Sequence, residues 1–334
     1  MRAIEATALG LEGLRVAERR KPAPGPGELL VALKAASLNY RDLVILKGLY
    51  RPDLKLPYVP LSDGAGVVEG VGAGVSRFTA GDRVIPVYTQ GWIDGLPTPQ
   101  QRTGRTLGVP LEGVAQHYIV VPEAEAVTTP ANLSDEEAAT LPIAALTAWS
   151  TLQEGGVKPG DWVLVQGTGG VALFALQFAK LAGARVIVLS SSEEKLARAK
   201  ALGAEVGIDY RAVPQWGPAV REVTGGRGVD IVVETTGETL TQSLAATAFG
   251  GFVGVIGFVG GFEAKLDIRQ LIGPMLRVQG IAVGSRRRFE AMNRAIEAHG
   301  LKPVIDRALP LEQAAEAFAL MERGGHFGKI VLRH

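Results

Sequence analysis

The sequence predicts an α/β protein in which a doubly wound parallel sheet is joined to a second, β-rich domain. Two observations support this fold class. From Asp161 to Val283, short apolar segments alternate with helical segments, which is typical of a parallel sheet covered by helices on both faces. Before residue 122, short strand-like segments lie between turns and no helical period lasts long. The chain has 334 residues, enough for about two domains.

Composition excludes several classes of function. The chain has 35 basic and 34 acidic residues, so its net charge of +1 offers no field for nucleic acid or an anionic membrane. It has no cysteine, which excludes disulfides, iron–sulfur clusters and thiolate zinc sites. Its four histidines lack metal-site spacing, although a carboxylate-only magnesium site stays open. No signal peptide and no membrane-length apolar run occurs, so we expect a cytoplasmic protein with a small-molecule substrate.

The segments suggest three regions. The β-rich domain is expected over residues 1–122, the parallel sheet over 123–287, and a C-terminal segment over 288–334. A capping box at Ser134 and Glu137 begins a helix that Pro142 should kink. The final strand, Lys329–Leu332, is expected to rejoin the first domain. Strands expected before residue 122 are Glu28–Leu33, Ala65–Val71 and Asp82–Val87.

A glycine turn is the main chemical motif. It directly follows the apolar strand Trp162–Gln166 and opens a helix, which is the context of a dinucleotide-binding turn. Its glycines allow a tight turn and a close approach of backbone to a diphosphate, and the helix N-terminus offers free amides. A purely structural turn is the alternative. The residues of the turn are Gly167, Thr168, Gly169, Gly170, Val171 and Ala172.

The end of the next strand favours NADPH, with NADH the less favoured cofactor. A site for NAD carries Asp or Glu at this place, where it binds the ribose 2′-hydroxyl. The strand Arg185–Leu189 is followed by serines and no carboxylate, which suits a 2′-phosphate. Ser191 has an alternative role as the cap of the helix expected over Ser191–Leu202, and Lys195 and Arg211 have an alternative explanation as solvated surface charges. The candidates are Ser190, Ser191, Lys195, Tyr210 and Arg211.

Several motifs together resemble one enzyme superfamily. They are Ala65–Glu69 with Gly70, Val71 and Gly72, then Ala80–Val84, Gly160 with Asp161, the glycine turn, and Gly328–Val331. With them the whole chain resembles the medium-chain dehydrogenase/reductase superfamily. The resemblance implies a GroES-like domain, a Rossmann domain and a C-terminal segment that returns to the first domain.

The metal positions of that superfamily indicate a branch. Its zinc alcohol dehydrogenases bind zinc through a Cys, a His in a Gly-His-Glu segment, and a later Cys or Asp. Aligned on Gly64–Gly66, the His position is Ser62 and the Glu position is Asp63, while the other ligands fall near Ser37–Asn39 and near Ile143. These side chains do not complete a tetrahedral zinc site. The chain therefore resembles the zinc-independent branch of quinone and enone reductases, and we expect no zinc.

That branch also implies the residues beside the nicotinamide. It carries Asn-x-x-Asp followed by Gly-Leu-Tyr, which here are Asn39, Asp42 and Gly48–Tyr50. The resemblance implies that Asn39, Asp42 and Tyr50 lie beside the nicotinamide with Ser62 close to it, so these four are the candidate catalytic residues. We expect Asn39 and Tyr50 to orient the substrate carbonyl or donate to it, and Asp42 to order the loop. Tyr40 is a weaker candidate donor.

Three further residues are expected to help hold the cofactor. The resemblance places Thr147 near the nicotinamide and gives Lys329 a role in fixing the cofactor. Gly257, just after the strand Phe252–Ile256, is added as a cofactor-site residue. The segment Tyr88–Leu107 has no counterpart in the short quinone reductases, and we expect it to shape the substrate entrance.

Three functions remain open at this point. The leading one is hydride transfer from NADPH to a quinone or an α,β-unsaturated carbonyl, because a delocalised negative charge needs no Lewis acid. The second is an NADP-dependent alcohol dehydrogenase or ketone reductase. The third is a nucleotide-binding protein without turnover, like the crystallin-like members of the superfamily.

An apolar edge strand predicts the quaternary structure. The strand Val278–Val283 is expected to be the last of the parallel sheet, where an open apolar edge favours association. In this superfamily such a strand pairs with its twin, so we expect a homodimer. We interpret His117 as a structural residue and Arg286–Arg288 as part of a solvated surface.

Overall fold

The computed structural model describes residues 1–50 and 54–334, which form two compact units. Unit 1 comprises Met1–Leu146 and Gly284–His334, and unit 2 comprises Thr147–Val283. The expected boundaries were 122 and 287. Residues 123–146 belong to unit 1 because helix α3 (Asp135–Ala139) packs against three strands of that unit's sheet.

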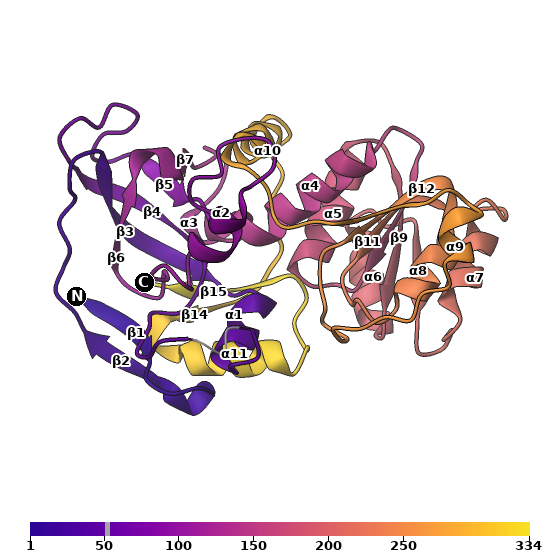
Figure 1. Ribbon diagram of the computed structural model, residues 1–334, viewed down its shortest axis with the longest axis horizontal. Coiled ribbons are helices and arrows are strands. Elements are labelled where there is room, and N and C mark those ends of the chain that lie inside the picture. Colours follow the sequence, from indigo (N-terminus) through magenta and orange to yellow (C-terminus); the bar gives the residue numbers. More distant parts are fainter. Residues whose placement is uncertain (51–53) are drawn as a thin grey trace. The chain divides into compact units, whose positions relative to one another are not determined.

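A seven-stranded sheet forms the centre of unit 1 (Figure 1). Its strands follow the order β14-β15-β3-β4-β5-β7, and β6 also pairs with β3. A separate antiparallel pair is made by β1 and β2. The strand bounds are β1 Arg2–Ala6, β2 Leu14–Glu18, β3 Glu28–Ser37, β4 Asp63–Val71, β5 Arg83–Pro86, β6 Tyr118–Pro122, β7 Ala126–Thr128, β14 Ile305–Pro310 and β15 Lys329–Arg333.

The C-terminal segment completes this sheet, as predicted. β15 runs parallel to β14 and antiparallel to β3, with Val331 opposite Ser37. In Figure 1 the yellow end of the chain therefore lies beside the indigo strands of its beginning. The Ser37 hydroxyl donates a hydrogen bond there to the carbonyl of Ile330, which lies 293 positions further along the sequence.

Short helices surround the sheet of unit 1. The helix expected after Ser134 is interrupted by a π-helical turn, Leu141–Ala145, because Pro142 has no N–H to continue an α-helix. Near the C-terminal end of the unit, a 3₁₀ turn at Leu311–Gln313 leads directly into α11. The helices are α1 Tyr40–Leu46, α2 Pro99–Gly104, α3, α10 Arg286–Ala298 and α11 Ala314–Glu322, with 3₁₀ turns at Leu11–Gly13, Glu123–Glu125 and Leu311–Gln313.

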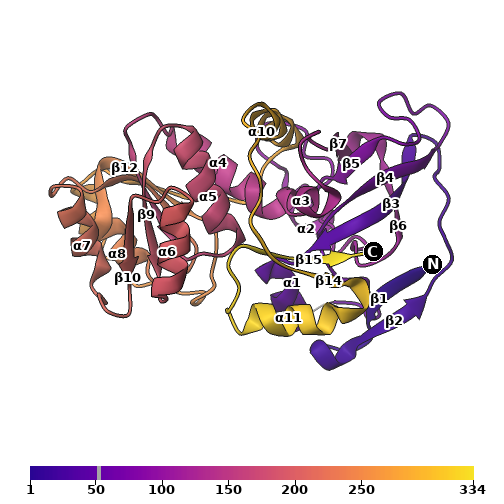
Figure 2. The same cartoon turned by 180° about the vertical axis from the view of Figure 1, so that it is seen from behind.

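Unit 2 is the doubly wound domain that the sequence predicts. Its six parallel strands follow the order β10-β9-β8-β11-β12-β13. Figure 1 shows α8 and α9 in front of the strands, and Figure 2 shows α5 and α6 in front of them from behind. The bounds are α4 Leu146–Gly155, β8 Trp162–Gln166, α5 Gly170–Leu181, β9 Arg185–Ser190, α6 Glu193–Ala201, β10 Val206–Asp209, α7 Trp216–Val223, β11 Val229–Glu234, α8 Leu240–Ala246, β12 Thr247–Val255, α9 Arg269–Ile272 and β13 Arg277–Gly280.

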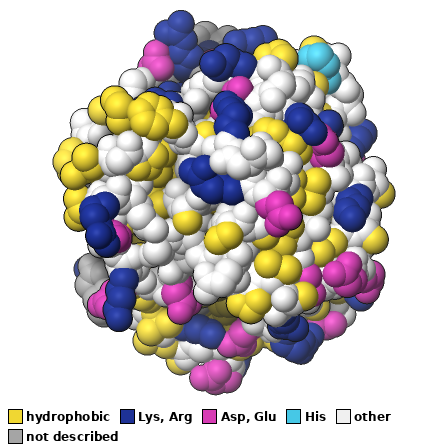
Figure 3. Space-filling model, turned by 90° about the vertical axis from the view of Figure 1, so that its right-hand side faces the viewer, with side chains coloured by type: hydrophobic (Ala, Val, Ile, Leu, Met, Phe, Trp, Pro, Cys, Tyr) yellow, Lys and Arg dark blue, Asp and Glu magenta, His cyan; other side chains and the backbone are white. Residues whose placement is uncertain are grey.

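The edge strand β13 differs from its prediction. It covers Arg277–Gly280, not Val278–Val283, and all four of its residues are exposed. Val283 has a φ of 63°, a left-handed conformation that cannot continue a strand. The segment between β12 and β13 exposes several large apolar side chains, as does β13 itself. Figure 3 shows hydrophobic side chains gathered along one side of its view. The exposed residues of this part of the chain include Val259, Phe262, Ile268, Ile272, Met275 and Val278.

None of the helices in the described parts of the chain combines the length and the apolar character that a bilayer crossing requires.

The cap of α6 provides a test of the fold in unit 2. The sequence suggests Ser191 as the cap, but the hydroxyl of Ser192 accepts the Lys195 N–H at 3.3 Å. We expect Ser192→Ala to lower the free energy of unfolding by about 1 kcal/mol, because a helix amide loses its acceptor. Ser191→Ala is the matched control and should change it much less. Chemical denaturation of both variants measures this, and equal losses would contradict the assignment.

Candidate active site

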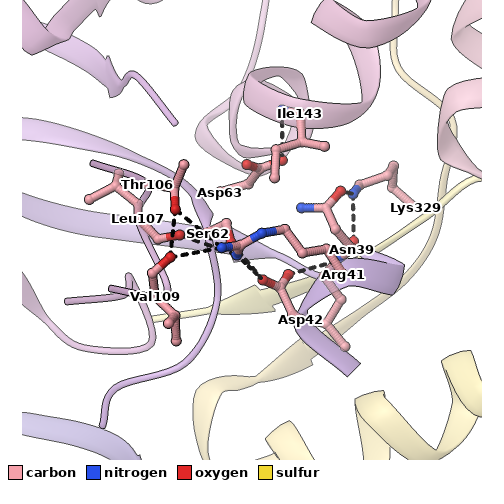
Figure 4. Close-up of polar contacts among 11 residues, drawn as sticks. Asn39, Arg41, Asp42, Ser62, Asp63, Thr106, Leu107, Val109, Ile143 and Lys329 are labelled. Carbon is pink, nitrogen blue, oxygen red and sulfur yellow. Dashed lines mark hydrogen bonds and ion pairs between the residues drawn. The ribbon is translucent and has the colours of Figure 1, made fainter. Parts of the chain in front are cut away.

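Three neighbouring strands of unit 1 gather the candidate residues. Ser37 at the end of β3 lies opposite Asp63 at the start of β4, and opposite Val331 of β15. Residues just beyond these strand ends therefore meet at one place (Figure 4). We call this group the strand-end cluster; its members are Asn39, Arg41, Asp42, Ser62, Asp63 and Lys329.

Asp42 holds one side of the strand-end cluster. One of its carboxylate oxygens, Oδ2, accepts the backbone N–H of Asn39 at 2.9 Å, which closes the first turn of α1. The other, Oδ1, accepts the Ser62 hydroxyl at 2.6 Å. Ser62 Oγ in turn accepts Arg41 Nη1 at 2.8 Å. Ser62 is fully buried, and its hydroxyl has both a donor and an acceptor role within the cluster.

Arg41 is the functional candidate that the sequence analysis missed. Its Nη2 donates to the carbonyl of Val109 at 2.8 Å and lies 3.3 Å from Thr106 Oγ1. Its guanidinium also lies 5.7 Å from the ring centre of Tyr50 and 5.1 Å from that of Tyr88. Arg41 thus fixes the end of the segment expected to shape the substrate entrance. Tyr50 keeps 40% of its surface exposed, so it lies at the rim of the cluster.

Lys329 orients Asn39 on the other side of the cluster. Its ammonium donates to the carbonyl of Leu38 at 2.5 Å and to Asn39 Oδ1 at 2.7 Å. The amide nitrogen of Asn39 must therefore point away from Lys329, and Figure 4 shows it directed toward Asp63. Asn39 Nδ2 and Asp63 Oδ1 are buried atoms without a hydrogen-bond partner. Lys329 was expected to hold the cofactor, but its donated bonds lie within unit 1.

Burial dominates the electrostatics of this cluster. It raises the pKa of Asp42, although the neighbouring Arg41 charge and the Ser62 hydroxyl oppose the rise. It also raises the pKa of Asp63, against the opposing effects of Lys329 and of the nearby Asn39 amide, whose geometry falls short of a hydrogen bond. Burial lowers the pKa of Lys329, which the two carboxylates oppose. Asp63 and Lys329 are therefore both poised to exchange a proton nearer neutrality than free side chains.

The glycine turn of unit 2 fits the diphosphate of a dinucleotide. Gly167 has a φ of 80°, which favours glycine, and a Cβ at Gly167 or Gly169 would meet no atom within 4 Å. Helix α5 begins at Gly170 without a side-chain cap, so its first amides remain available to an anion. Thr168 is buried and Val171 is half-buried in this turn.

Other predicted cofactor residues lie at the same edge of the parallel sheet. Ser190 ends β9 opposite Asp209 of β10, and Ser190 Oγ accepts the Ser192 N–H at 3.3 Å. Tyr210 and Arg211 follow β10 and are exposed. The remaining three are Ser191 and Lys195, both half-buried at the start of α6, and Gly257, where a Cβ would lie 2.4 Å from the Thr235 carbonyl oxygen.

Thr147 is the first residue of unit 2 and is buried in α4. Its carbonyl accepts the Thr151 hydroxyl at 2.7 Å. The sequence-predicted site residues thus form two sets, one at the strand ends of unit 1 and one at the edge of the parallel sheet of unit 2.

Comparison with known proteins identifies the family of this chain. A sequence model of the zinc-binding dehydrogenase family matches residues 170–298, and one of the alcohol dehydrogenase GroES-like domain matches residues 25–131. The chain is 46% identical over 333 residues to a zinc-type alcohol dehydrogenase-like protein of Schizosaccharomyces pombe, covering 97% of this chain and 96% of that protein.

Several solved structures match the whole of this chain, and two of them serve as examples. One is an NAD-dependent alcohol dehydrogenase, with a TM-score of 0.91, 41% identity and 100% of its own chain covered. The other is a thermostable alcohol dehydrogenase from Pyrobaculum aerophilum with bound cobalt and zinc, with a TM-score of 0.86, 32% identity and 99% covered. Fold and comparisons define an NAD(P)-dependent oxidoreductase of the alcohol dehydrogenase type. The chain belongs to the zinc-binding dehydrogenases of the medium-chain dehydrogenase/reductase superfamily.

These findings correct three expectations. The assignment to the zinc-independent branch is wrong, because the matching family model and the Schizosaccharomyces pombe relative are both of the zinc type. The expected cofactor set, NADPH without zinc, is wrong for the same reason; zinc and NAD(P) are the cofactors expected of the family. The leading expectation of hydride transfer to quinones or enones is wrong, and the similarity to alcohol dehydrogenases favours the second expectation, an alcohol dehydrogenase.

The donor chemistry of the strand-end cluster does not fit a tetrahedral zinc centre. Within residues 1–50 and 54–334, no three His, Cys, Asp or Glu side chains gather as metal ligands. The carboxylates of the cluster already face Arg41 and Lys329, and the aligned ligand position Ser62 carries a hydroxyl engaged with Asp42. The steps proposed below therefore rest on this chain's own side chains.

The buried Asp63 carboxyl predicts a pH-dependent stability. Burial raises its pKa from 3.8 to about 7, so the folded state holds a proton that the unfolded chain releases as the pH rises above about 4. The native protein therefore loses this stabilisation between about pH 4 and pH 7. In Asp63→Asn the group cannot ionise, so the Tm of the variant relative to the native protein should rise by several degrees from pH 5 to pH 7.

Asp230→Asn is the control for this experiment. The pKa of Asp230 is lowered by its Arg227 and Trp162 partners, so the stability it contributes is already complete above its unfolded pKa. Its Tm difference should stay constant from pH 5 to pH 8. Thermal unfolding at each pH measures both variants, and an Asp63→Asn difference that is independent of pH would contradict the assignment.

Proposed function

We propose that this enzyme interconverts an alcohol and its aldehyde or ketone, with NAD(P) as the hydride carrier. The family and the similarity to alcohol dehydrogenases over nearly the whole chain support this reaction class. The observation on this chain that carries the proposal is the pair of unpartnered buried atoms, Asn39 Nδ2 and Asp63 Oδ1, which belong to two neighbouring side chains of the strand-end cluster.

A hydroxyl group matches this pair of atoms. An alcohol oxygen can accept from Asn39 Nδ2 while its proton is directed to Asp63 Oδ1, so both unsatisfied groups would gain a partner. When the carbonyl is the substrate, the same amide donates to the carbonyl oxygen and a protonated Asp63 supplies the proton. When NAD(P) is bound, its chemistry would be hydride transfer, while Asn39 and Asp63 bind the oxygen and move the proton.

The raised pKa of Asp63 suits this proton transfer. A general acid or base works best when its pKa lies near the working pH, and burial raises the pKa of Asp63 toward neutrality. The positive charge of Lys329 stabilises the ionised carboxylate of Asp63 and so opposes the rise in its pKa. It also fixes the amide of Asn39 in the orientation that donation requires.

Arg41, Asp42 and Ser62 would hold this arrangement in place. Asp42 fixes the backbone of Asn39, and Ser62 links Asp42 to Arg41. Because Ser62 is fully buried with its hydroxyl engaged, we assign it a positioning role, whereas the sequence suggests a catalytic one. Tyr50, at the exposed rim, is suited to contact the substrate body instead.

A substrate screen tests the reaction class. Primary and secondary alcohols are offered with NAD⁺ and NADP⁺, and matching aldehydes and ketones with the reduced cofactors, while absorbance follows the nicotinamide. We expect turnover in both directions. Activity confined to quinones or enones, or cofactor binding without any turnover, would overturn the proposal.

Asn39→Ala tests the proposed donor. Loss of an oriented donor to the reacting oxygen should lower kcat/KM about 100-fold, while the dissociation constant of the cofactor changes little. Ser37→Ala is the matched control, since it removes a buried hydrogen bond to the Ile330 carbonyl nearby without touching the Asn39–Asp63 pair. Steady-state kinetics and cofactor titration measure both variants. Equal kcat/KM for the two would remove Asn39 from the mechanism.

We also propose that two copies of the chain associate through β13. This strand is the last in its sheet, its four residues are exposed, and the segment that precedes it along the chain exposes large apolar side chains. Pairing of an open edge with its twin would satisfy backbone groups and cover apolar surface.

Val278→Asp is the variant that tests the association. Val278 on β13 is 39% exposed, and a buried charge at the paired edge should shift the dimer to monomer in sedimentation at micromolar concentration. Val213→Asp is the control, because this valine is 37% exposed and follows β10 at the opposite edge of the sheet. A native protein that sediments as a monomer would contradict the proposal.

A further inference from the structure

Two carboxylates of β11 hold β8 at its opposite ends. At the beginning of the strands, Asp230 Oδ2 accepts the backbone N–H of Trp162 at 2.8 Å. At their other end, Glu234 Oε2 accepts the side-chain amide of Gln166 at 2.7 Å. Of these two contacts, only the one between Glu234 and Gln166 lies at the edge of the sheet that carries the glycine turn, since Gly167 directly follows Gln166.

Glu234 is fully buried and its carboxylate is surrounded by neutral donors. Oε1 accepts the backbone amides of Thr236 at 3.0 Å and Gly237 at 3.1 Å, and the Thr236 hydroxyl at 2.7 Å. Oε2 accepts the hydroxyl of Ser243 in addition to Gln166. Burial of a carboxylate raises the free energy of the folded state unless both oxygens accept hydrogen bonds. Glu234 therefore favours the arrangement in which all these donors stay in place.

Gln166 transmits this order to the phosphate turn. Its Oε1 accepts the Thr235 N–H at 3.0 Å, and its backbone carbonyl accepts the Thr235 hydroxyl at 3.2 Å. Gln166 is thus bound on both its side chain and its backbone to the end of β11. Thr235 in turn approaches Gly257 after β12 so closely that a Cβ there would lie 2.4 Å from the Thr235 carbonyl oxygen.

We infer that Glu234 is a positioning residue for dinucleotide binding. It sets the place of the glycine turn relative to the ends of β11 and β12, so that the turn's amides are aligned before the diphosphate arrives. A preorganised site binds more tightly because less order must be created on binding. The inference rests on the NAD(P) dependence of the enzyme and is independent of which alcohol it oxidises.

The charge of Glu234 alone predicts the opposite effect. A carboxylate near a diphosphate repels it, so neutralisation would strengthen cofactor binding if electrostatics decided the outcome. Positioning predicts that the same neutralisation weakens binding, because an amide nitrogen in place of one oxygen would face donors. The sign of the change in Glu234→Gln therefore separates the two roles.

The experiment titrates the purified native protein and Glu234→Gln with NAD⁺, NADP⁺ and ADP-ribose, without substrate, and records Tm. We expect an increase of about tenfold in each dissociation constant. In a separate turnover assay, the cofactor KM should rise to match while kcat stays nearly unchanged. Asp230→Asn is the matched control, because it weakens the opposite end of the same strand pair. It should lower Tm while leaving the dissociation constants within about twofold.

A double exchange keeps the test decisive if Glu234→Gln folds poorly. In Gln166→Glu/Glu234→Gln the donor and acceptor change places, so the bond between the two side chains can form again and cofactor affinity should recover toward the native value. Native affinity in Glu234→Gln, tighter binding in it, or equal weakening by Asp230→Asn would each overturn the inference. Because no substrate is present, these outcomes are separate from any failure of the alcohol screen.

Discussion

The balance of buried charge in unit 1 is the constraint on which the site depends. Arg41, Asp42, Asp63 and Lys329 bring two positive and two negative side chains into an interior where an unpaired charge would be very costly. Each member therefore limits the geometry of the others. The orientation of the Asn39 amide and the engagement of the Ser62 hydroxyl both follow from this balance.

Unit 2 solves a similar problem without cations. Glu234 is satisfied by backbone amides, hydroxyls and one side-chain amide, and these donors belong to the loop after β11 and to the residue before the glycine turn. In an open parallel sheet, ligands bind beyond the carboxyl ends of the strands. The ordered end of β11 is thus also the end where order benefits a ligand, whereas Asp230 at the other end serves stability alone.

Much of the fold could be predicted because its signals are local. The glycine turn requires a backbone conformation that only glycine adopts easily, as the φ of Gly167 shows. The alternation of strands and helices in unit 2 is likewise written in short segments. Local signals located the ends of helices and strands less well. The cap of α6 is Ser192, one residue after the predicted Ser191, and β13 ends before Val283, which has a left-handed backbone conformation.

The features that were missed depend on distant partners. Arg41 meets residues 65 and 68 positions further along the chain, and Gln166 lies 68 positions from Glu234, so no periodicity or spacing reveals either contact. Asn39 could be proposed from its motif, but not the direction of its amide, which Lys329 sets from 290 positions away. The zinc-ligand positions alone indicate the zinc-independent branch. Similarity along the whole chain indicates the zinc type instead.

The position of Lys329 at the start of β15 has a consequence for biosynthesis. β15 leaves the ribosome long after β3 and β4, yet it lies between β14 and β3 and carries the ammonium that orients Asn39. A nascent chain can form β3 and β4 long before this ammonium exists, and until then the carboxyls of Asp42 and Asp63 lack one of their counter-charges. The strand-end cluster therefore reaches its final order only when β15 has been synthesised and has paired with β3.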